Sequence, residues 1–297
     1  MNAAGNHGLR GKLLIDEPMS KHTSWRLGGP ADRYYIPADL ADLQAYLAAL
    51  DEGTGVLWVG LGSNLLVRDG GIRGQVIAPL NALKELRLEE GGGVYCECGV
   101  SCARLARFCH QQELAGADFF AGIPGTVGGA LAMNAGAFGG ETWTAVECAI
   151  MIDRRGELIE RARNEFDIGY RRVRMPHEEW FAAARFRFPP RADGEDSNIR
   201  QLLRQRNQSQ PIGLPSCGSV FKNPPGKHAA QLIEAAGLKG YGLGTARVSD
   251  KHANFIISND DTVASDVEAL IEYIRKTVAE RFDVRLETEV RIVGEER

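Results

Sequence analysis

Two glycine-rich segments are the first candidates for ligand-binding loops. Residues 60–64 directly follow a predicted buried strand at 56–59, and the denser segment spans 122–129. Glycine has no Cβ, so its main-chain amides can closely approach a large flat ligand or a phosphate. Neither segment ends in the Gly-Lys-Ser/Thr of a nucleoside-triphosphate loop, and the first lacks the third glycine of a dinucleotide fingerprint. Taken alone, the pattern fits one ligand held from two sides and a pair of tight turns equally well.

Three polar side chains could act on a substrate. Arg171 carries a guanidinium, whose paired donors suit a carboxylate. Ser219 carries a hydroxyl, which is a poor acid unless a neighbour or water polarises it. Glu289 shares a predicted strand face with Glu287, so spacing alone does not choose between the two carboxylates. Each has an ordinary alternative: a solvated basic run for Arg171, a turn-stabilising hydroxyl for Ser219 and an exposed strand carboxylate for Glu289.

The cysteines indicate neither a hydrolase nor a metal site. Cys217 lies close to Ser219, but no histidine partner is fixed by spacing and no Gly-x-Ser-x-Gly motif is present. The spacing of Cys96, Cys98 and Cys102 superficially resembles a metal site, yet no second Cys/His pair follows at zinc-finger spacing. The six cysteines are therefore predicted to be buried small hydrophobic residues in a reducing compartment, with no metal bound.

Composition indicates a globular protein of about two domains. The chain has 297 residues, of which 44% are hydrophobic and 25% charged. Its net charge of −4 provides no footprint for nucleic acid. No segment approaches the ~18 apolar residues of a membrane span, and residues 1–21 lack the apolar core of a secretory signal. We therefore expect a cytoplasmic protein without membrane or nucleic-acid partners.

Hydrophobic periodicity predicts the elements that must position these residues. Helices are expected at 40–50, after the cap Ser101, and at 198–206, 229–236 and 262–282. Strands are expected at 56–59, 75–79, 83–88, 94–98, 146–152, 158–161, 181–188, 254–258 and 284–293. The helix at 262–282 should bury one face, formed by Val263, Val267, Leu270, Ile274 and Val278. The proline- and acid-rich stretch 189–197 is the expected linker.

Motifs along nearly the whole chain resemble one known family. The sequence His22-Thr-Ser-Trp-Arg-Leu-Gly28-Gly-Pro-Ala31 and the segments 60–74 and 122–130 are similar to the FAD-binding part of UDP-N-acetylenolpyruvoylglucosamine reductases. The segments 215–224, 251–255 and 287–294 are similar to the C-terminal part of the same family. Any one of these motifs would be a weak signal, whereas their ordered occurrence in one chain is a strong one.

The resemblance implies a fold and a reaction. The fold is α+β: a two-lobed FAD-binding domain of the vanillyl-alcohol oxidase-like type at 1–190, with lobes at about 1–78 and 79–190, then an α+β substrate-binding domain at 198–297. The reaction is the reduction of the enolpyruvyl ether of UDP-N-acetylglucosamine to UDP-N-acetylmuramate by NADPH, through FAD, in peptidoglycan precursor synthesis. The short segment between Tyr170 and Pro189 resembles the family's compact type, which lacks a substrate-covering insertion. No obligate protein partner is implied.

The resemblance also implies roles for individual residues. Arg171 would stabilise the negative charge that develops on the substrate carboxylate, Ser219 would donate the proton, and the match to Glu-Val-Arg-Ile-x-Gly selects Glu289 to assist. The FAD-binding set is Gly60, Gly62, Ser63, Asn64, Leu65, Asp69, Gly122, Ile123, Pro124, Gly125, Thr126, Gly128, Gly129, Asn134 and Gly136. The substrate-binding set is Tyr170, Lys222, Asn223, Lys251 and His252. Val173 occupies a position where the family often has serine.

Two other functions remain open at this point. One is an FAD-dependent oxidase of the related fold that acts on another alcohol, which the C-terminal motifs disfavour. The other is a nucleotide-sugar binding protein without redox activity, which would lack a flavin spectrum.

Overall fold

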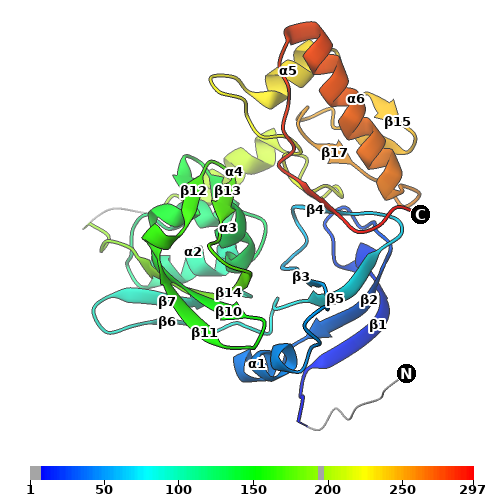
Figure 1. Ribbon diagram of the computed structural model, residues 1–297. Coiled ribbons are helices and arrows are strands. Elements are labelled where there is room, and N and C mark those ends of the chain that lie inside the picture. Colours follow the sequence, from blue (N-terminus) through cyan, green and yellow to red (C-terminus); the bar gives the residue numbers. More distant parts are fainter. Residues whose placement is uncertain (1–7, 193–196) are drawn as a thin grey trace. The chain divides into compact units, whose positions relative to one another are not determined.

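The computed structural model describes residues 8–192 and 197–297, and its α+β architecture is shown in Figure 1. Inter-residue contacts divide the chain into two compact units. Unit 1 contains the described parts of 1–15, 33–60 and 74–202, and unit 2 contains 16–32, 61–73 and 203–297. Two segments from the N-terminal quarter of the chain therefore pack with the C-terminal third. Each unit has a hydrophobic core of its own.

The N-terminal third of the chain forms a four-stranded sheet. Its strand order is β1 (Lys12–Pro18), β2 (Pro30–Ile36), β5 (Ile72–Ile77) and β3 (Val56–Trp58), and β3 and β5 are parallel. The predicted helix at 40–50 is confirmed as α1 (Leu40–Ala48). It begins where the Asp39 carboxylate accepts a hydrogen bond from the Asp42 N–H, a standard helix cap.

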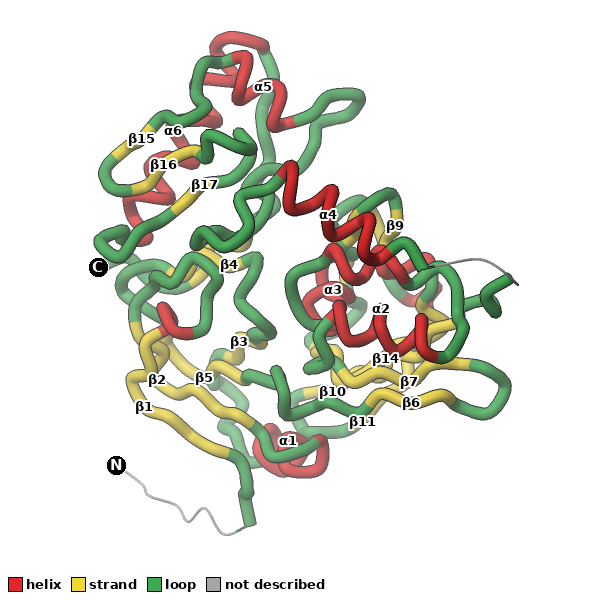
Figure 2. Tube along the Cα trace, turned by 180° about the vertical axis from the view of Figure 1, so that it is seen from behind, coloured by secondary structure: helices red, strands yellow, loops and turns green. Residues whose placement is uncertain are grey.

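Unit 1 is built on an antiparallel five-stranded sheet. Its order is β11 (Leu158–Ala162), β10 (Val146–Asp153), β14 (Glu179–Arg187), β7 (Gly93–Glu97) and β6 (Leu86–Leu88). The helices α2 (Cys102–Gln111) and α3 (Val127–Met133) lie over one face of this sheet (Figure 2). The cap of α2 is the predicted one, because the Ser101 hydroxyl accepts from the Arg104 N–H at 3.3 Å.

Short elements connect these layers in unit 1. Two small hairpins pair β8 (Gly136–Ala137) with β9 (Gly140–Glu141), and β12 (Asp167–Gly169) with β13 (Arg172–Arg174). Single turns of 3₁₀ helix occur in unit 1 at η2 (Asp118–Gly122), η3 (Thr142–Thr144) and η4 (Arg163–Glu165), and in unit 2 at η1 (Met19–Lys21). The second of the hairpins carries Tyr170 and Arg171 in its turn.

Unit 2 packs two helices against small sheets. The helices are α5 (Ala229–Ala235) and α6 (Ala264–Phe282), and a three-stranded sheet has the order β15 (Gly242–Leu243), β16 (Ala246–Val248) and β17 (Ile256–Ile257). The strand β18 (Arg291–Val293) pairs in parallel with β4 (Leu65–Val67). The helix α4 (Ile199–Ser209) spans the boundary at residue 202/203. None of the described helices is long and apolar enough to cross a membrane.

Several predictions from periodicity were wrong in detail. The strand expected at 284–293 is only three residues long, with one isolated bridge between Phe221 and Thr288, and the strand expected at 254–258 shrinks to β17. Val263 precedes α6 and is 44% exposed, because the helix begins one residue later. The other four residues of the predicted face are buried.

The stretch 189–197 was predicted to be a linker, and its described residues make hydrogen bonds to unit 1. The Arg191 N–H donates to the Glu113 carbonyl at 2.6 Å, and the Ser197 hydroxyl donates to the Asp118 carboxylate at 3.1 Å. Residues 193–196 lie outside the described part of the chain, as do residues 1–7 of the stretch searched for a secretory signal. The described ends of 189–197 are thus bonded to unit 1.

Candidate active site

In unit 1, the glycine-rich segment 122–136 contains α3 and the loop that leads into it. The Thr126 hydroxyl accepts a hydrogen bond from the Gly129 N–H at 3.3 Å and so caps this helix. Within the described chain, no protein acceptor bonds the N–H of Gly125 or the N–H of Thr126. Each of these main-chain donors is available to an anionic ligand. The loop therefore offers donors to a cofactor without a placed cation.

Close packing explains most of the glycines around this loop. A Cβ on Gly60 would overlap the Thr126 hydroxyl, and a Cβ on Gly122 would overlap the ring of Phe138. The N–H of Gly128 donates to the Cys98 carbonyl at 2.9 Å, and a Cβ at this position would crowd the side chain of Cys98. These glycines let the loop lie directly on the protein beneath it. The outer face of the loop is left for a ligand.

Asn134 fixes the end of the segment. It terminates α3 in the left-handed conformation (φ 47°) and is 2% exposed. Its Nδ2 donates to the Glu141 carboxylate at 3.0 Å and to the Gly169 carbonyl at 3.2 Å, while its Oδ1 accepts from the Trp143 N–H at 3.1 Å. The side-chain amide is thus engaged by the protein. It ties α3 to the hairpin whose turn begins after Gly169.

Arg171 lies in that turn with its guanidinium directed back to the loop. Its Nη1 donates to the Asn134 carbonyl at 3.3 Å and its Nη2 to the Gly136 carbonyl at 2.9 Å. Its backbone is left-handed (φ 51°), an uncommon conformation for a residue with a Cβ. Tyr170, with its ring centre 5.0 Å from the guanidinium carbon, is 46% exposed. Arg171 is partly buried and bonded to the loop, whereas Arg172 is exposed, so a uniformly solvated basic run is not observed.

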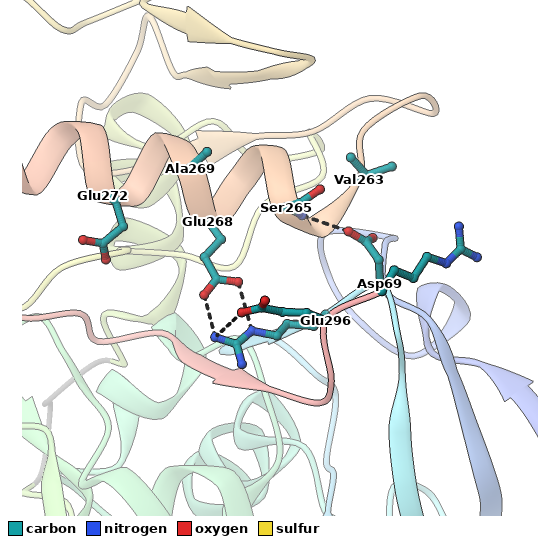
Figure 3. Close-up of a pocket in the computed structure, with 9 residues that line it drawn as sticks. Asp69, Val263, Ser265, Glu268, Ala269, Glu272 and Glu296 are labelled. Carbon is teal, nitrogen blue, oxygen red and sulfur yellow. Dashed lines mark hydrogen bonds and ion pairs between the residues drawn. The ribbon is translucent and has the colours of Figure 1, made fainter.

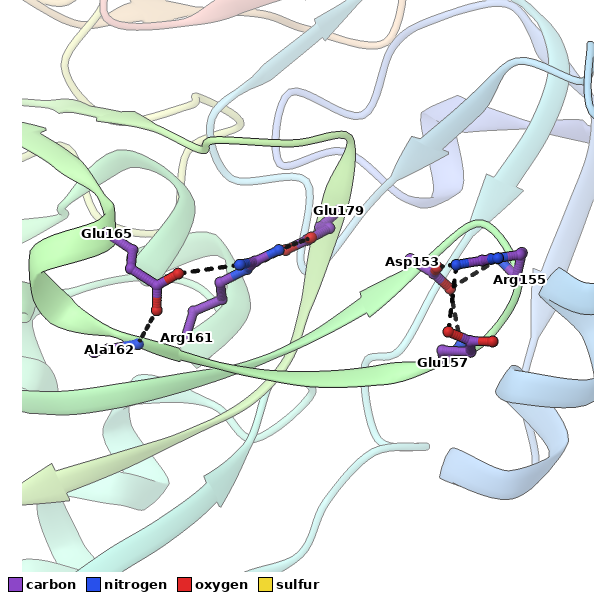
Figure 4. A network of polar contacts seen from close by, with 7 residues as sticks. All are labelled: Asp153, Arg155, Glu157, Arg161, Ala162, Glu165 and Glu179. Carbon is purple, nitrogen blue, oxygen red and sulfur yellow. Dashed lines mark hydrogen bonds and ion pairs between the residues drawn. The ribbon is translucent and has the colours of Figure 1, made fainter.

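An ion pair between Arg161 and Glu179 joins the two ends of the segment 162–178, which contains this hairpin. The guanidinium of Arg161 makes two hydrogen bonds, of 3.1 and 2.6 Å, to the buried carboxylate of Glu179. It also donates to Glu165 at 3.0 Å, and Glu165 in turn accepts from the Ala162 N–H at 2.7 Å (Figure 4). The two ends of the 162–178 segment are therefore held together. This network restrains the hairpin that presents Tyr170 and Arg171.

In unit 2, the motif at 22–31 interlocks with the glycine-rich segment at 61–73. The Ser24 N–H donates to the Gly62 carbonyl, and the Gly29 N–H donates to the Arg68 carbonyl, both at 3.1 Å. Gly62 adopts φ +67°, and a Cβ there would overlap the His22 carbonyl oxygen. No other residue type fits this position. The two motifs, distant in sequence, thus form one folded loop pair.

This loop pair is joined to the C-terminal motif through Asn64 and Glu289. The Nδ2 of Asn64 donates to the main-chain carbonyl of Glu289 at 3.0 Å, and the Arg291 N–H donates to the Asn64 carbonyl at 3.0 Å. From Arg291 onward, β18 runs parallel to β4. The structure therefore brings Ser63, Asn64 and Leu65 of the predicted FAD set next to the predicted catalytic glutamate.

Ser219 is connected to the same place through its neighbour. It is half-buried and lies outside any helix or strand, directly after Gly218 (φ +70°). The Glu289 N–H donates to the carbonyl of Val220 at 2.8 Å. This hydrogen bond joins the main chain that follows Ser219 to the main chain at Glu289. Upstream, the Cys217 thiol lies 3.2 Å from the Leu65 carbonyl oxygen. Ser219, Glu289 and Asn64 are thus assembled within unit 2.

The structure distinguishes the two candidate glutamates. The carboxylate of Glu287 is 78% exposed and pairs with the Lys222 ammonium at 3.4 Å. Glu289 is half-buried, and its main chain is bonded on both sides as described above. A half-buried carboxylate is better placed to act on a bound substrate than one paired in solvent. The geometry therefore favours Glu289.

The remaining predicted substrate-binding residues of unit 2 are on its surface loops. The Asn223 side chain accepts from the Ala229 N–H at 3.0 Å and so supports the start of α5, while the Lys251 ammonium donates to the Asn207 carbonyl at 2.5 Å. Burial lowers the pKa of His252 below its usual range. Its Nδ1 accepts from the Asn254 N–H at 3.3 Å, so the neutral ring carries its proton on Nε2.

Asp69 occupies a different setting from the rest of the predicted FAD set. Its two carboxylate oxygens accept from the Ala264 N–H at 2.9 Å and the Ser265 N–H at 3.0 Å, at the start of α6 (Figure 3). A surface pocket of about 530 Å³ lies beside it. Its lining carries both signs of charge, because the carboxylates of Glu268 and Glu272 lie beside Arg68, which pairs with Glu268 at 2.7 Å. The side chain of Asp69 acts as a helix cap.

The cysteines behave as small core residues. All six are buried and unpaired as disulfides, and burial raises the pKa of the Cys217 thiol to about 12. A thiol of this kind is protonated near neutral pH and is a poor nucleophile. Among residues 8–192 and 197–297, no cluster of histidine, cysteine or carboxylate side chains could hold a metal ion. The prediction that the cysteines are buried is confirmed.

Comparison with known proteins identifies the family. Residues 210–293 match the model of the UDP-N-acetylenolpyruvoylglucosamine reductase C-terminal domain, and residues 31–161 match an FAD binding domain. The UDP-N-acetylenolpyruvoylglucosamine reductase of Alkalilimnicola ehrlichii is 56% identical over 296 residues, covering 99% of both chains. That of Methylococcus capsulatus is 54% identical over 288 residues, covering 96% of this chain and 94% of its own.

The chain belongs to the UDP-N-acetylenolpyruvoylglucosamine reductase family.

The fold of this reductase agrees with that of a solved relative. The crystal structure of the UDP-N-acetylenolpyruvylglucosamine reductase from Thermus caldophilus matches 96% of this chain and 99% of its own, with a TM-score of 0.80 at 29% identity. This match confirms the expected α+β fold of the family.

Sequence reasoning missed one polar residue of this reductase that contacts the candidate site. Asn254 lies inside the Lys251–Phe255 motif, but it was not singled out, because a buried asparagine has no signature in spacing. Its side chain bonds both main-chain polar groups of Phe221, two residues after Ser219. The signal that could have found it is an amide residue at an otherwise apolar strand start, Asn254-Phe-Ile-Ile.

Proposed function

We propose that this flavoprotein reduces the enolpyruvyl ether of UDP-N-acetylglucosamine to UDP-N-acetylmuramate, with FAD as cofactor and NADPH as reductant, in peptidoglycan precursor synthesis. Family membership and the FAD-binding match support the reaction and the cofactor. The observation that carries the assignment of residues is the set of bonds joining Glu289 to Asn64 and to Val220. These bonds bring a candidate cofactor loop, a carboxylate and a serine together in unit 2.

The FAD would be held mainly by main-chain groups. When bound, it supplies hydride-transfer chemistry between NADPH and the substrate. The proposed contacts are Gly60, Gly62, Ser63, Asn64, Leu65, Gly122, Ile123, Pro124, Gly125, Thr126, Gly128, Gly129 and Gly136. The amides at Gly125 and Thr126 support a role in diphosphate binding. Asn134 and Asp69 would act through the loops they support, since their side chains are engaged by the protein.

Arg171 would bind and polarise the substrate carboxylate. Hydride addition to the enolpyruvyl group creates an enolate-like species with its negative charge shared by that carboxylate. A guanidinium stabilises such charge through paired donors. Two main-chain carbonyls, of Asn134 and Gly136, orient the Arg171 guanidinium in advance. Preorganisation of this kind lowers the cost of reorganising the site during the reaction.

Ser219 would then protonate the adjacent carbon. A hydroxyl is a weak acid, so its proton transfer needs the developing enolate as acceptor and a polar neighbour. Glu289 would position the substrate or a water for this step. Tyr170, Lys222, Asn223, Lys251 and His252 would bind the nucleotide-sugar. Neutral His252 would contribute a hydrogen bond from Nε2 and no charge.

The broader assignments follow from the chemistry. We infer that residues 1–190 mainly bind FAD and residues 198–297 mainly bind the substrate, with the FAD-binding segment 61–73 packed in unit 2. We place the enzyme in the cytoplasm, where NADPH and nucleotide-sugars are made available to soluble enzymes. Supply of cell-wall precursor connects this activity with cell shape and division.

A two-part assay tests the proposal. The purified protein should show an oxidised flavin spectrum that bleaches with NADPH and returns on adding the enolpyruvyl nucleotide. In Ser219→Ala, bleaching should proceed at the wild-type rate, while its return by the nucleotide should slow severely. A protein without a flavin spectrum would contradict the function, and equal slowing of both half-reactions would contradict the proton-donor role.

A further inference from the structure

We infer that Asn254 is a positioning residue that holds Ser219 in the orientation needed for proton donation. The inference rests on the function proposed above, because it gives Asn254 a role only through Ser219. It concerns residues of unit 2 alone.

The side chain of Asn254 makes hydrogen bonds to the main chain of Phe221 that a neighbouring β-strand would otherwise make. Its Nδ2 donates to the Phe221 carbonyl at 2.8 Å, and its Oδ1 accepts from the Phe221 N–H at 3.0 Å. Both residues are buried, at 4% and 1% exposure. One planar amide thereby satisfies both main-chain groups of Phe221, which restrains the two peptide groups on either side of this residue.

The main chain of Asn254 extends the same clamp. Its carbonyl accepts from the Val220 N–H at 2.9 Å, and the Val220 carbonyl accepts from the Glu289 N–H at 2.8 Å. The four main-chain polar groups of residues 220 and 221 are thus bonded, three of them by Asn254. The fourth bond leads to the candidate catalytic glutamate. Asn254 therefore holds residues 220 and 221, which directly follow Ser219 and are bonded to Glu289.

Ser219 depends on this clamp because little local structure holds it. It belongs to no helix or strand, and the preceding Gly218 is left-handed with no atom within 4 Å of where a Cβ would lie. The nearest support upstream is the buried Cys217 side chain. A displacement of about 1 Å in a reacting group can slow a reaction by about 100-fold. A change in the orientation of the peptides after Ser219 would displace its hydroxyl.

Two substitutions at Asn254 change its hydrogen bonds to Phe221 in different ways. Asn254→Asp keeps an acceptor for the Phe221 N–H but puts a carboxylate oxygen against the Phe221 carbonyl. Asn254→Gln keeps both functions and shifts them by one methylene, which provides a milder variant if the aspartate variant fails to fold. Thr262→Val is the matched control, since Thr262 is also buried in unit 2 and its hydroxyl lies 3.0 Å from the Asn259 side-chain oxygen and 3.2 Å from the Thr245 carbonyl.

We expect the Asn254 variants to slow the second half-reaction, reoxidation of the flavin, and to leave the first, its reduction by NADPH, nearly unchanged. With the flavin-loaded protein, NADPH should bleach each Asn254 variant at nearly the wild-type rate. Reoxidation by the enolpyruvyl nucleotide should slow by about 10- to 100-fold in Asn254→Asp and less in Asn254→Gln. Thr262→Val should retain both rates. Hydrogen exchange followed by mass spectrometry should show faster exchange around Phe221 in the Asn254 variants than in Thr262→Val.

A double mutant then tests whether Asn254 acts through Ser219. If it does, adding Asn254→Asp to Ser219→Ala should slow reoxidation by less than twofold further. Wild-type reoxidation in both Asn254 variants, or a full additional penalty in the Ser219→Ala background, would overturn the inference. Failure of the proposed function looks different: Ser219→Ala would then reoxidise at the wild-type rate by itself.

Discussion

The side-chain amide of Asn64 donates a 3.0 Å hydrogen bond to the main-chain carbonyl of Glu289, across 225 positions of sequence. Since the Glu289 N–H is also bonded, to Val220, both main-chain polar groups of this residue are fixed. The place of this residue in the chain is therefore set by hydrogen bonds to two separate segments, at residues 64 and 220. A loop predicted to bind the cofactor is thereby coupled to a residue predicted to act on the substrate.

Replacing Arg171 with lysine should impair the reaction while leaving the fold intact. Lysine keeps the positive charge but cannot bridge the Asn134 and Gly136 carbonyls with a planar fork. We expect reoxidation of the flavin by the enolpyruvyl nucleotide to slow by about 100-fold, with NADPH oxidation in the first half-reaction retained. Stopped-flow absorbance measures both. Arg172→Lys, on the exposed neighbour, is the control, and an equal defect there would argue against a specific role for Arg171.

Glu289→Gln and Glu287→Gln form a matched pair. Both remove one negative charge at positions two residues apart. We expect kcat to fall by at least tenfold for Glu289→Gln, because a half-buried carboxylate near Ser219 is lost. Glu287→Gln removes only a solvent-exposed pair with Lys222 and should change kcat less than twofold. Steady-state kinetics measures kcat for both variants. A larger fall in kcat for Glu287→Gln than for Glu289→Gln would assign the catalytic role to Glu287.

Asp69→Ala should lower stability more than it lowers catalysis. The Asp69 carboxylate caps α6 through two main-chain N–H groups, and loss of such a cap costs about 1 kcal/mol in the free energy of unfolding. Urea unfolding followed by tryptophan fluorescence measures this loss. Glu296→Ala, which removes a 79% exposed carboxylate from the same pocket, should cost less than about 0.5 kcal/mol. A stable Asp69→Ala protein that no longer binds flavin would instead assign Asp69 to the cofactor.

The stability of the protein should decrease as the pH falls through the range of His252. Burial lowers the pKa of this ring, nearby Lys239 lowers it further, and Glu234 opposes the shift. The unfolded chain therefore takes up a proton at higher pH than the folded one. The contribution of His252 is fully present above about pH 6.5 and is lost as the pH falls through the lowered folded value.

Urea unfolding between pH 5 and 8 tests this expectation for His252. Wild type and His252→Gln should differ by an amount that changes only on the acidic side of about pH 6.5. The exposed His228 in the same unit provides the control variant His228→Gln, which removes a histidine that is not buried. A constant difference for His252→Gln would contradict a buried, neutral ring.

Sequence reasoning located most elements of the fold because their periodic signals are local. The long helix α6 and the interior strand β10 both have strong hydrophobic signals, and both were predicted to within two residues. The strand expected at 284–293 failed for a different reason. Its alternation of apolar and polar residues is real, but its partners lie at Leu65–Val67 and near Phe221, and only part of the segment pairs with either.

The candidate site could be named from motifs, but its internal connections could not. The motif match identified Ser219 and Glu289 as residues, yet the bond through Val220 depends on chain geometry that no spacing encodes. The same holds for Asp69, whose place in a glycine-rich motif indicated the cofactor while its side chain caps α6. Buried amides such as Asn134 and Asn254 are hard to predict, since asparagine is common in exposed turns and only the fold shows which ones are enclosed.

The alternation of the chain between the two units has a consequence for biosynthesis. Strand β4 must wait for β18, more than 220 residues later, before it can pair. At ~5–20 residues per second, this delay on the ribosome is roughly 10–40 seconds. During that time the segments 16–32 and 61–73 lack their C-terminal partners. We expect unit 2 to form only after the chain is released, and a separately expressed 203–297 fragment to lack the strand and the helix cap that complete it.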